Sequence, residues 1–270
     1  MSISMESPAL SATRDFRVVM VLEAGDAIHS SFARQLDIFS QKFHRSITKT
    51  IHQFKGHIVK HDNHRYEVFF TSSTNAVLCA LKIKYNFKYI GQRVDSNHKH
   101  LGIGISVSPE DNPAETTARA SQLCEMVPGP IVITTKVKEM YEQENRQAKI
   151  DPDLIRTLKP KEERFLAQVM AFSQTHWNNP RFTLKTLGTE LGLSRAQLYR
   201  NLKKLTGKPP TAFMREYRLN KALHLLHLQF GNISEVAHET GFNSPTYFTR
   251  CFVNTYGMLP SKYAQLNLRV

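Results

Sequence analysis

The sequence has few cysteines, a single tryptophan and no long apolar run. Its three cysteines, Cys79, Cys124 and Cys251, lie far apart without a CxxC spacing, which argues against a disulfide framework or a zinc knuckle. We expect them to be buried as small hydrophobic residues. No apolar stretch approaches the roughly 20 residues that a membrane helix needs, and the first residues lack the pattern of a secretory signal. We therefore predict a cytoplasmic protein that does not enter a membrane.

Acidic residues are also in the minority, with 23 Asp and Glu against 36 Lys and Arg and a net charge of +13. Residues 1–150 carry 19 basic and 15 acidic side chains, a net charge of +4, whereas residues 151–270 carry 17 and 8, a net charge of +9. The length of 270 residues favours two domains. The excess in the C-terminal half favours a polyanionic partner, although solvated basic faces are common and charge alone leaves this open.

The C-terminal half contains an internal duplication. "LGTELGLSRAQLYRNLKKLTGKPPTAF" at 187–213 resembles "VAHETGFNSPTYFTRCFVNTYGMLPSKY" at 236–263. The spacing between matched residues changes from 49 to 50 within the stretch, so the second copy has one extra residue in its turn. The matches are Glu190 and Gly192 with Glu239 and Gly241, then Arg200, Gly207 and Pro210 with Arg250, Gly257 and Pro260.

Each copy predicts a short helix, a glycine-containing turn and a second helix. A capping residue opens the second helix, which we assign to Ser194 in the first copy and to Asn243 in the second. This is the order of a helix-turn-helix unit.

The second helix of each copy is amphipathic. Leu198, Leu202 and Leu205 are expected to pack inward in the first copy, as are Phe248, Phe252 and Tyr256 in the second. The outward side chains suit DNA, because Arg can grip guanine and a Thr methyl can meet thymine. The alternative is a pair of ordinary solvated helical hairpins. The outward residues are Arg195, Ala196, Tyr199, Arg200 and Lys203, then Thr246, Thr249 and Arg250.

The segment 162–268 resembles the DNA-binding domain of AraC/XylS-type transcription regulators, most clearly through "ISEVAHETGFNSPTYFTRCFVNTYGMLPSKY". The resemblance implies seven helices, a long helix over about 209–228 that joins two helix-turn-helix units, and recognition helices that enter successive segments of the major groove. The DNA-binding residues it implies, with the neighbouring helix starts, are Ser194, Arg195, Ala196, Tyr199, Arg200, Lys203, Asn243, Ser244, Pro245, Thr246, Thr249 and Arg250.

The N-terminal half predicts an α+β domain. A strand, a helix, a hairpin, a second helix and a further strand follow one another, which is a ferredoxin-like order. Another helix, strand and helix come after them. The expected strands are 17–24, 57–61, 65–70, 100–107 and 130–134, and the expected helices are 31–54, 73–88, 114–126 and 135–143.

Residues 16–143 resemble the class III nucleotide cyclase domain through "FKGHIVKHDNHRYEVFFTSSTNAVLCALKI", "HLGIGISV" and "ARASQLCEMVPGPIVITTKVKEMY". Active cyclases of this family hold metal ions with two Asp residues, whose positions fall at Ala24 and at Asn63-His64. Glu23 and Asp26 lie nearby on uncertain registers. The transition-state Asn and Arg fall near Ala118 and Gln122. The resemblance therefore implies a catalytically inactive domain that forms homodimers, senses a nucleotide or small molecule, or does both.

The stretch "GHIVKHDNHRYEVFF" at 56–70 carries three histidines around the expected turn. His57 and His61 are expected on one face of the strand, and with His64 they would suit a transition metal. A solvated hairpin is the preferred interpretation, so no cofactor and no metal site are predicted. A shifted register in which Asp62 supplies a carboxylate would still leave one metal ligand and both transition-state groups absent.

These observations predict an inactive cyclase-like domain at 1–143, a linker at 144–161 and an AraC-type DNA-binding domain at 162–270. The protein is expected to be a sequence-specific transcription regulator on double-stranded DNA, acting as a homodimer and not as an enzyme. The alternatives are a DNA-tethered nucleotide cyclase with a rearranged active site and a dimerisation scaffold without a ligand.

Overall fold

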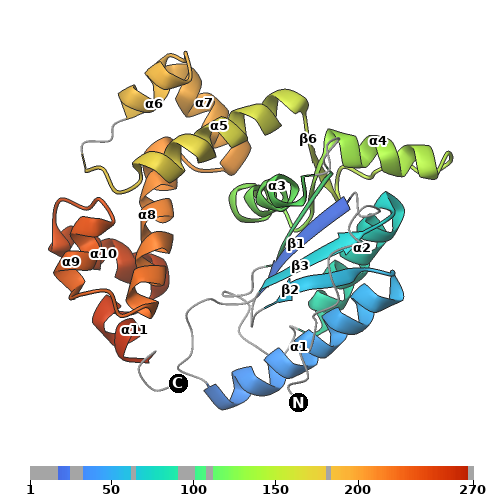
Figure 1. Ribbon diagram of the computed structural model, residues 1–270, viewed down its shortest axis with the longest axis horizontal. Helices are drawn as coiled ribbons and strands as arrows, with labels where there is room; N and C mark the ends of the chain where they lie inside the picture. Colours follow the sequence, from blue (N-terminus) through green and yellow to red (C-terminus); the bar gives the residue numbers. More distant parts are fainter. Residues whose placement is uncertain are drawn as a thin grey trace, which may run out of the picture. The chain divides into compact units, whose positions relative to one another are not determined.

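The computed structural model describes residues 18–24, 33–61, 65–90, 101–107, 112–180 and 184–266. The chain divides into two compact units (Figure 1). The N-terminal unit contains the first strand and residues 34–160, and the C-terminal unit contains residues 161–266.

In its described residues, the N-terminal unit alternates six strands with four helices. They are β1 (Val18–Ala24), α1 (Ala33–Gln53), β2 (His57–His61), β3 (Arg65–Phe70), α2 (Ser73–Ile90), β4 (Leu101–Val107), α3 (Pro113–Met126), β5 (Val132–Thr134), α4 (Thr135–Glu144) and β6 (Arg156–Leu158). The predicted hairpin is confirmed on both of its strands, while its turn at 62–64 lies outside the described residues.

The strands form one sheet in the order β2-β3-β1-β4-β5-β6. The neighbouring pairs β2–β3, β3–β1 and β1–β4 are antiparallel, whereas β4–β5 and β5–β6 are parallel. The first four strands and their two helices thus follow the β-α-β-β-α-β path of a split βαβ unit. The prediction of an α+β N-terminal domain is confirmed.

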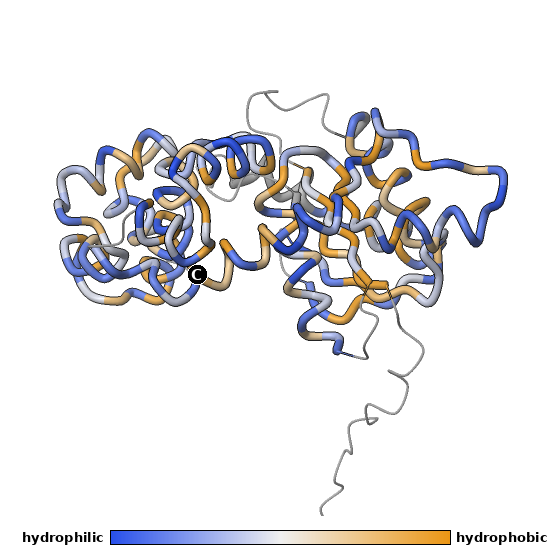
Figure 2. The backbone as a smooth tube through the Cα atoms, turned by 90° about the horizontal axis from the view of Figure 1, so that it is seen from above, coloured by the Kyte–Doolittle hydropathy of each residue, from blue (hydrophilic) through white to orange (hydrophobic). Residues whose placement is uncertain are grey.

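Helices cover both faces of this sheet (Figure 1). Ile51 of α1, Ala80 of α2 and Val137 of α4 are buried in one core with alternate residues of the strands. On the other face, α3 packs over β1 and β4. Gly104 allows this close approach, because a Cβ atom there would lie 2.0 Å from the Ala120 carbonyl oxygen. Apolar residues, orange in Figure 2, accordingly gather at the centre of the unit.

The expectation that residues 144–161 form a linker needs correction. Strand β6 lies within this segment and pairs with β5. Ile150, Ile155 and Leu158 are buried. Polar residues and two prolines favoured a linker, but three apolar residues in a short segment suffice to add an edge strand once a parallel neighbour exists.

Glu144, the last residue of α4, holds the start of α2. Its carboxylate accepts hydrogen bonds from the backbone N–H and the hydroxyl of both Ser73 and Thr74, at 2.6 to 3.1 Å, and from the hydroxyl of Ser72 at 2.8 Å. Partial burial would raise the pKa of Glu144, but these hydrogen bonds outweigh it and lower the pKa to about 2.

The C-terminal unit is all-helical in its described residues and contains the seven helices that the AraC resemblance implies. They are α5 (Pro160–His176), α6 (Leu184–Glu190), α7 (Arg195–Thr206), α8 (Pro210–His227), α9 (Ile233–Glu239), α10 (Pro245–Tyr256) and α11 (Pro260–Leu266). Helix α8 lies between α6–α7 and α9–α11 (Figure 1). It corresponds to the long helix predicted at about 209–228.

All three cysteines are buried and unpaired, as predicted. Burial raises the pKa of the Cys79 thiol to about 12, so this thiol stays protonated. Among the described residues, no helix combines the length and the apolar character needed to cross a bilayer.

Candidate nucleic-acid interface

The C-terminal unit contains two helix-turn-helix units, α6–α7 and α9–α10, with matching helix lengths. Helices α6 and α9 have seven residues each, and α7 and α10 have twelve each. Each turn contains a glycine with positive φ, +62° at Gly192 and +76° at Gly241. The turn between α9 and α10 is one residue longer than the turn between α6 and α7. This confirms the extra residue that the change in repeat spacing predicted.

Ser194 caps α7, as predicted. Its Oγ atom accepts a hydrogen bond from the Gln197 backbone N–H, and the Gln197 side chain bonds back to the Ser194 backbone, which completes a capping box.

The assignment of Asn243 as the cap of α10 is wrong, because Ser244 holds that position and accepts from the Tyr247 backbone N–H. The physical reason is Pro245. Proline is favoured as the first helical residue, where a backbone N–H is not needed, so the residue immediately before it becomes the cap.

The α7 helix presents the side chains that the sequence predicted. Leu198, Leu202 and Leu205 are buried, and the outward set Arg195, Ala196, Tyr199, Arg200 and Lys203 is exposed. Tyr199 is 44% exposed, and the Lys203 ammonium lies 5.7 Å from the centre of its ring. A cation over an aromatic face is attracted to it, so the two side chains support each other on the outer face.

The α10 helix buries Phe248, Phe252 and Tyr256, also as predicted. Asn243, Thr246 and Arg250 are exposed, while Ser244, Pro245 and Thr249 are half-buried.

The sequence reasoning missed Tyr247, which is 42% exposed on α10. The Arg250 guanidinium lies 5.3 Å from its ring centre. Its spacing of three residues from Arg250 is a signal that could have identified it, because residues three apart are neighbours on a helix surface.

Two surface hollows connect the recognition helices to the start of α8. One, of about 590 Å³, is lined by Arg195, Ala196, Tyr199 and Arg200 of α7. The other, of about 320 Å³, is lined by Asn243, Ser244 and Tyr247 of the second unit and by Arg215 and Arg218 of α8. Leu184 and Thr211 line both hollows. The N-terminal ends of α7 and α10 therefore lie on either side of the start of α8.

Not every cation near these hollows is available to a ligand. Arg218 donates to the backbone carbonyl oxygens of Trp177 and Asn179, both at 2.8 Å, and burial lowers the pKa of its guanidinium. Lys221 lies over the rings of Trp177 and Tyr217. Arg218 and Lys221 thus hold the segment after α5 against α8, whereas the side chain of Arg215 is exposed.

In the N-terminal unit, the described carboxylates near the expected cyclase positions lie close to an arginine. Arg65, at the start of β3, pairs with Glu125 of α3 at 2.6 Å and with Glu67 at 3.7 Å, and Glu23 lies opposite it on β1. Burial would lower the pKa of Arg65, but Glu125 and Glu23 outweigh it and raise the pKa. Asp26 and Asp62–His64 lie outside the described residues. Ala118 is exposed and Gln122 half-buried on α3.

The histidines of β2 do not share a face, contrary to expectation. A bulge between Ile58 and Lys60 shifts the register, so His57 lies opposite Phe69 and His61 opposite Tyr66. Phe69 packs on the α3 side and Tyr66 in the opposite core, and the His61 ring stacks on Tyr66 with centroids 5.7 Å apart. The described residues contain no cluster of three metal-ligating side chains.

A family model described as "Helix-turn-helix domain" matches residues 187–265. "Histidine kinase P4" of Formosa agariphila is 33% identical over 107 residues, which are 40% of this chain and 8% of that protein. "Uncharacterized HTH-type transcriptional regulator YdeC" of Bacillus subtilis is 33% identical over 87 residues, 32% of this chain and 30% of that protein. The match therefore spans less than a third of either relative.

Two solved structures resemble parts of this chain weakly. The DNA-binding domain of AdpA in complex with a target DNA is 29% identical and covers 37% of this chain and 89% of that chain, with a TM-score of 0.36. The guanylyl cyclase Cya2 is 13% identical and covers 47% of this chain and 79% of that chain, with a TM-score of 0.36.

The C-terminal region contains a helix-turn-helix domain over residues 187–265, which confirms this part of the prediction. Two of the matched relatives are named as regulators, the transcriptional regulator YdeC and the transcriptional activator RhaS. The cyclase resemblance and the dimer stay predictions.

Proposed function

We propose that this chain is a sequence-specific DNA-binding transcription regulator of the cytoplasm that reads double-stranded DNA with both α7 and α10. The observation that carries the proposal is the pair of recognition helices whose N-terminal ends flank the start of α8. Residues at the N-terminal end of a recognition helix are the ones that reach base edges in this class of motif. The name of YdeC, a transcriptional regulator, supports the same function.

Each recognition helix offers a different set of contacts. Arg200 and Arg250 are exposed and suit bidentate bonds to guanine, while the methyl groups of Thr246 and Thr249 suit thymine. Ala196 and Pro245 have no side-chain hydrogen-bonding group, so contacts at these positions are apolar. The stretch of DNA backbone between the two groove segments would cross the start of α8, where Thr211 and the exposed Arg215 suit phosphate.

For the N-terminal unit, we propose a catalytically inactive cyclase-like module that pairs two chains, senses a nucleotide or small molecule, or does both. The β-α-β-β-α-β path and the matched stretches support the cyclase relationship. Arg65 supports the loss of catalysis, because its guanidinium already neutralises the carboxylates of Glu67 and Glu125. Ala118 and Gln122 lack the charge that would stabilise a departing pyrophosphate.

The test of DNA binding is a selection of random duplexes with the full-length protein, followed by affinity measurements across salt concentrations. We expect an enriched sequence whose binding weakens steeply as salt rises, because phosphate contacts release counterions. A selection that enriches no sequence, or binding that is insensitive to ionic strength, would contradict the proposal.

A DNA-tethered cyclase is the competing function. We expect no cyclic nucleotide from ATP or GTP with magnesium or manganese. Turnover that persists in a Glu23→Ala, Asp62→Ala double variant would show that chemistry resides at residues other than those aligned here. A thermal-shift screen against nucleotides and metabolites then separates a sensor from a bare scaffold, because a ligand that binds the native state raises its stability.

A further inference from the structure

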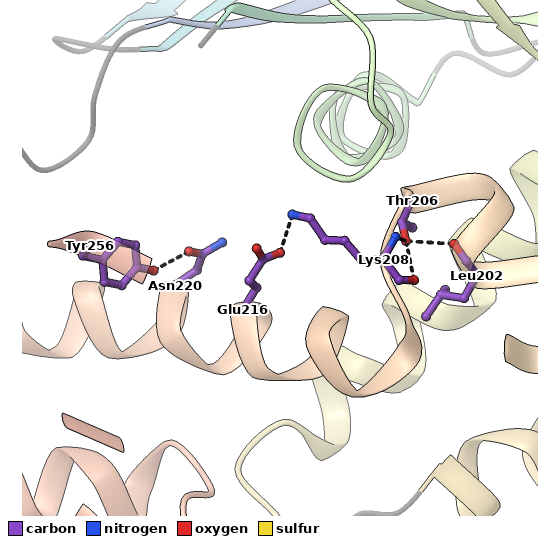
Figure 3. Close-up of polar contacts among 6 residues, drawn as sticks. All are labelled: Leu202, Thr206, Lys208, Glu216, Asn220 and Tyr256. Atoms are coloured by element: carbon purple, nitrogen blue, oxygen red, sulfur yellow. Dashed lines mark hydrogen bonds and ion pairs between the residues drawn. The ribbon is translucent and has the colours of Figure 1, made fainter. Parts of the chain in front are cut away.

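The C-terminal ends of α7 and α10 are both attached to the same face of α8, but through different side-chain contacts (Figure 3). Lys208, in the turn after α7, donates to the Glu216 carboxylate. The hydroxyl of Tyr256, the last residue of α10, donates to the Asn220 Oδ1 atom at 2.7 Å. Asn220 follows Glu216 by four residues in α8, so the two acceptors lie one turn apart.

The attachment of α7 is local and exposed. The Thr206 hydroxyl donates to the Leu202 carbonyl oxygen at 2.8 Å and accepts from the Lys208 backbone N–H at 3.2 Å, so it fixes only its own turn. The side chains of Lys208 and Glu216 are 46% and 38% exposed. Exposed ion pairs contribute little and are screened by salt, so this attachment constrains the helix weakly.

The attachment of α10 is part-buried and neutral, because its donor Tyr256 is buried whereas its acceptor Asn220 is exposed. Tyr256 occupies the position that Thr206 holds in the first copy, and it is only 9% exposed. Its ring packs edge-to-face on Phe252 with centroids 4.6 Å apart. Burial, and then the nearby Glu216 carboxylate, raise the pKa of its phenol, so the phenol stays protonated and donates.

We propose that the Tyr256–Asn220 hydrogen bond fixes the angle of α10 on α8 and so makes the protein select DNA sites by the separation of the two sequence elements that α7 and α10 read. The proposal rests on the proposed function. Helix α10 has twelve residues and is therefore about 18 Å long. A tilt of about 10° around its C-terminal end would move its reading end by about 3 Å, close to the rise of one base pair. Tyr256 is thus a positioning residue.

The experiment uses the full-length protein and the duplex obtained by selection, with one base pair inserted or removed between the two elements. We expect the native protein to bind the altered duplexes at least about tenfold more weakly than the parent. The Tyr256→Phe variant should bind the parent duplex nearly as tightly as the native protein does. Its ratio of affinities for the parent and the altered duplexes should be at least about threefold smaller than that of the native protein.

Matched variants separate positioning from folding. Asn220→Leu removes the acceptor and should copy Tyr256→Phe, and the two effects should not add. Asn220→Asp keeps an oxygen acceptor and should retain the native discrimination. Lys208→Met removes the exposed attachment and should change discrimination little. Thermal unfolding of each variant shows whether the C-terminal unit stays folded.

An unchanged spacing profile in both Tyr256→Phe and Asn220→Leu would overturn the inference while DNA binding stands. If Tyr256→Phe unfolds, the test is the comparison of Asn220→Leu with Asn220→Asp. Equal discrimination between the parent and the altered duplexes by these two variants would also overturn the inference. If the native protein enriches no sequence, the proposed function and this inference fall together.

Discussion

The two helix-turn-helix units share a backbone but differ in the side chains that hold it. Both second helices end at a glycine in the left-handed conformation, Gly207 at φ +73° and Gly257 at φ +72°. Both are followed by a helix that begins with a proline, Pro210 or Pro260. Residues that act through backbone conformation thus repeat between the units and preserve their geometry.

The interiors and outer faces have diverged. Leu198 and Leu202 fill the first unit where Phe248 and Phe252 fill the second. The exposed Tyr199 of α7 and the half-buried Thr249 of α10 occupy equivalent positions in the two units. The comparison teaches that one scaffold accepts two cores and two outer faces, provided that its turn and cap residues are kept.

The largest expected effect tests the difference between the two cores. We expect Phe248→Ala to lower the free energy of unfolding of the C-terminal unit by about 4 kcal/mol, and Leu198→Ala by about 3 kcal/mol, because the larger ring leaves the larger cavity. Trp177 is the single tryptophan of the chain and lies in this unit, so its fluorescence during denaturant unfolding reports both changes. A greater loss for Leu198→Ala would reverse the comparison.

The glycines in the two turns, Gly192 and Gly241, allow a sharper comparison of the two units. A Cβ atom on Gly241 would lie 2.7 Å from the Trp177 carbonyl oxygen, whereas a Cβ atom on Gly192 meets nothing within 4 Å. Both positions have positive φ, which costs an alanine about 1 to 2 kcal/mol. We expect Gly192→Ala to cost about 1 kcal/mol and Gly241→Ala about 3 kcal/mol, because the second adds a clash with backbone. Equal losses in the same unfolding assay would mean that the turn at Gly241 relaxes freely.

The exposed arginines of α7 and α10, Arg200 and Arg250, compare the outer faces of the two helices. Changing Arg200 or Arg250 to Ala should each cost about 1 to 3 kcal/mol of binding at the selected duplex if the side chain grips a base. We expect the larger loss for Arg250, because the Tyr247 ring beside it orders its guanidinium. Titrations on the selected duplex and on a scrambled one measure this. A uniform loss on both duplexes would reassign the residue to a phosphate contact.

The smallest expected difference concerns the helix starts. Replacing a capping serine by alanine costs about 1 kcal/mol. We expect Ser194→Ala to cost a few tenths of a kcal/mol more than Ser244→Ala, because only Ser194 belongs to a complete capping box. Paired denaturant curves at one protein concentration measure this difference, and a larger cost for Ser244→Ala would contradict it.

The sequence predicted the features that depend on local chemistry. Glycines, prolines and repeat spacing gave both helix-turn-helix units and the longer second turn, and apolar periodicity gave the buried faces of α7 and α10. The order of strands and helices gave the α+β class of the N-terminal unit.

Features that depend on a partner elsewhere in the chain were missed or misread. Strand β6 needs β5 beside it, and the bulge in β2 is visible only in its pairing with β3. The cap of α10 was displaced by one residue because Pro245 was not treated as its first helical residue. Arg65 was missed because its partner Glu125 lies on α3, 60 residues later in the sequence.

The central claim is that the two units read two separate DNA elements. The most direct measurement repeats the selection of random duplexes with native, Arg200→Ala and Arg250→Ala full-length proteins and compares the base preference at every position. The account predicts an enriched site with two elements, where Arg200→Ala relaxes preference in one element and Arg250→Ala in the other. Relaxation of the same positions by both variants, or a site with a single element, would contradict it.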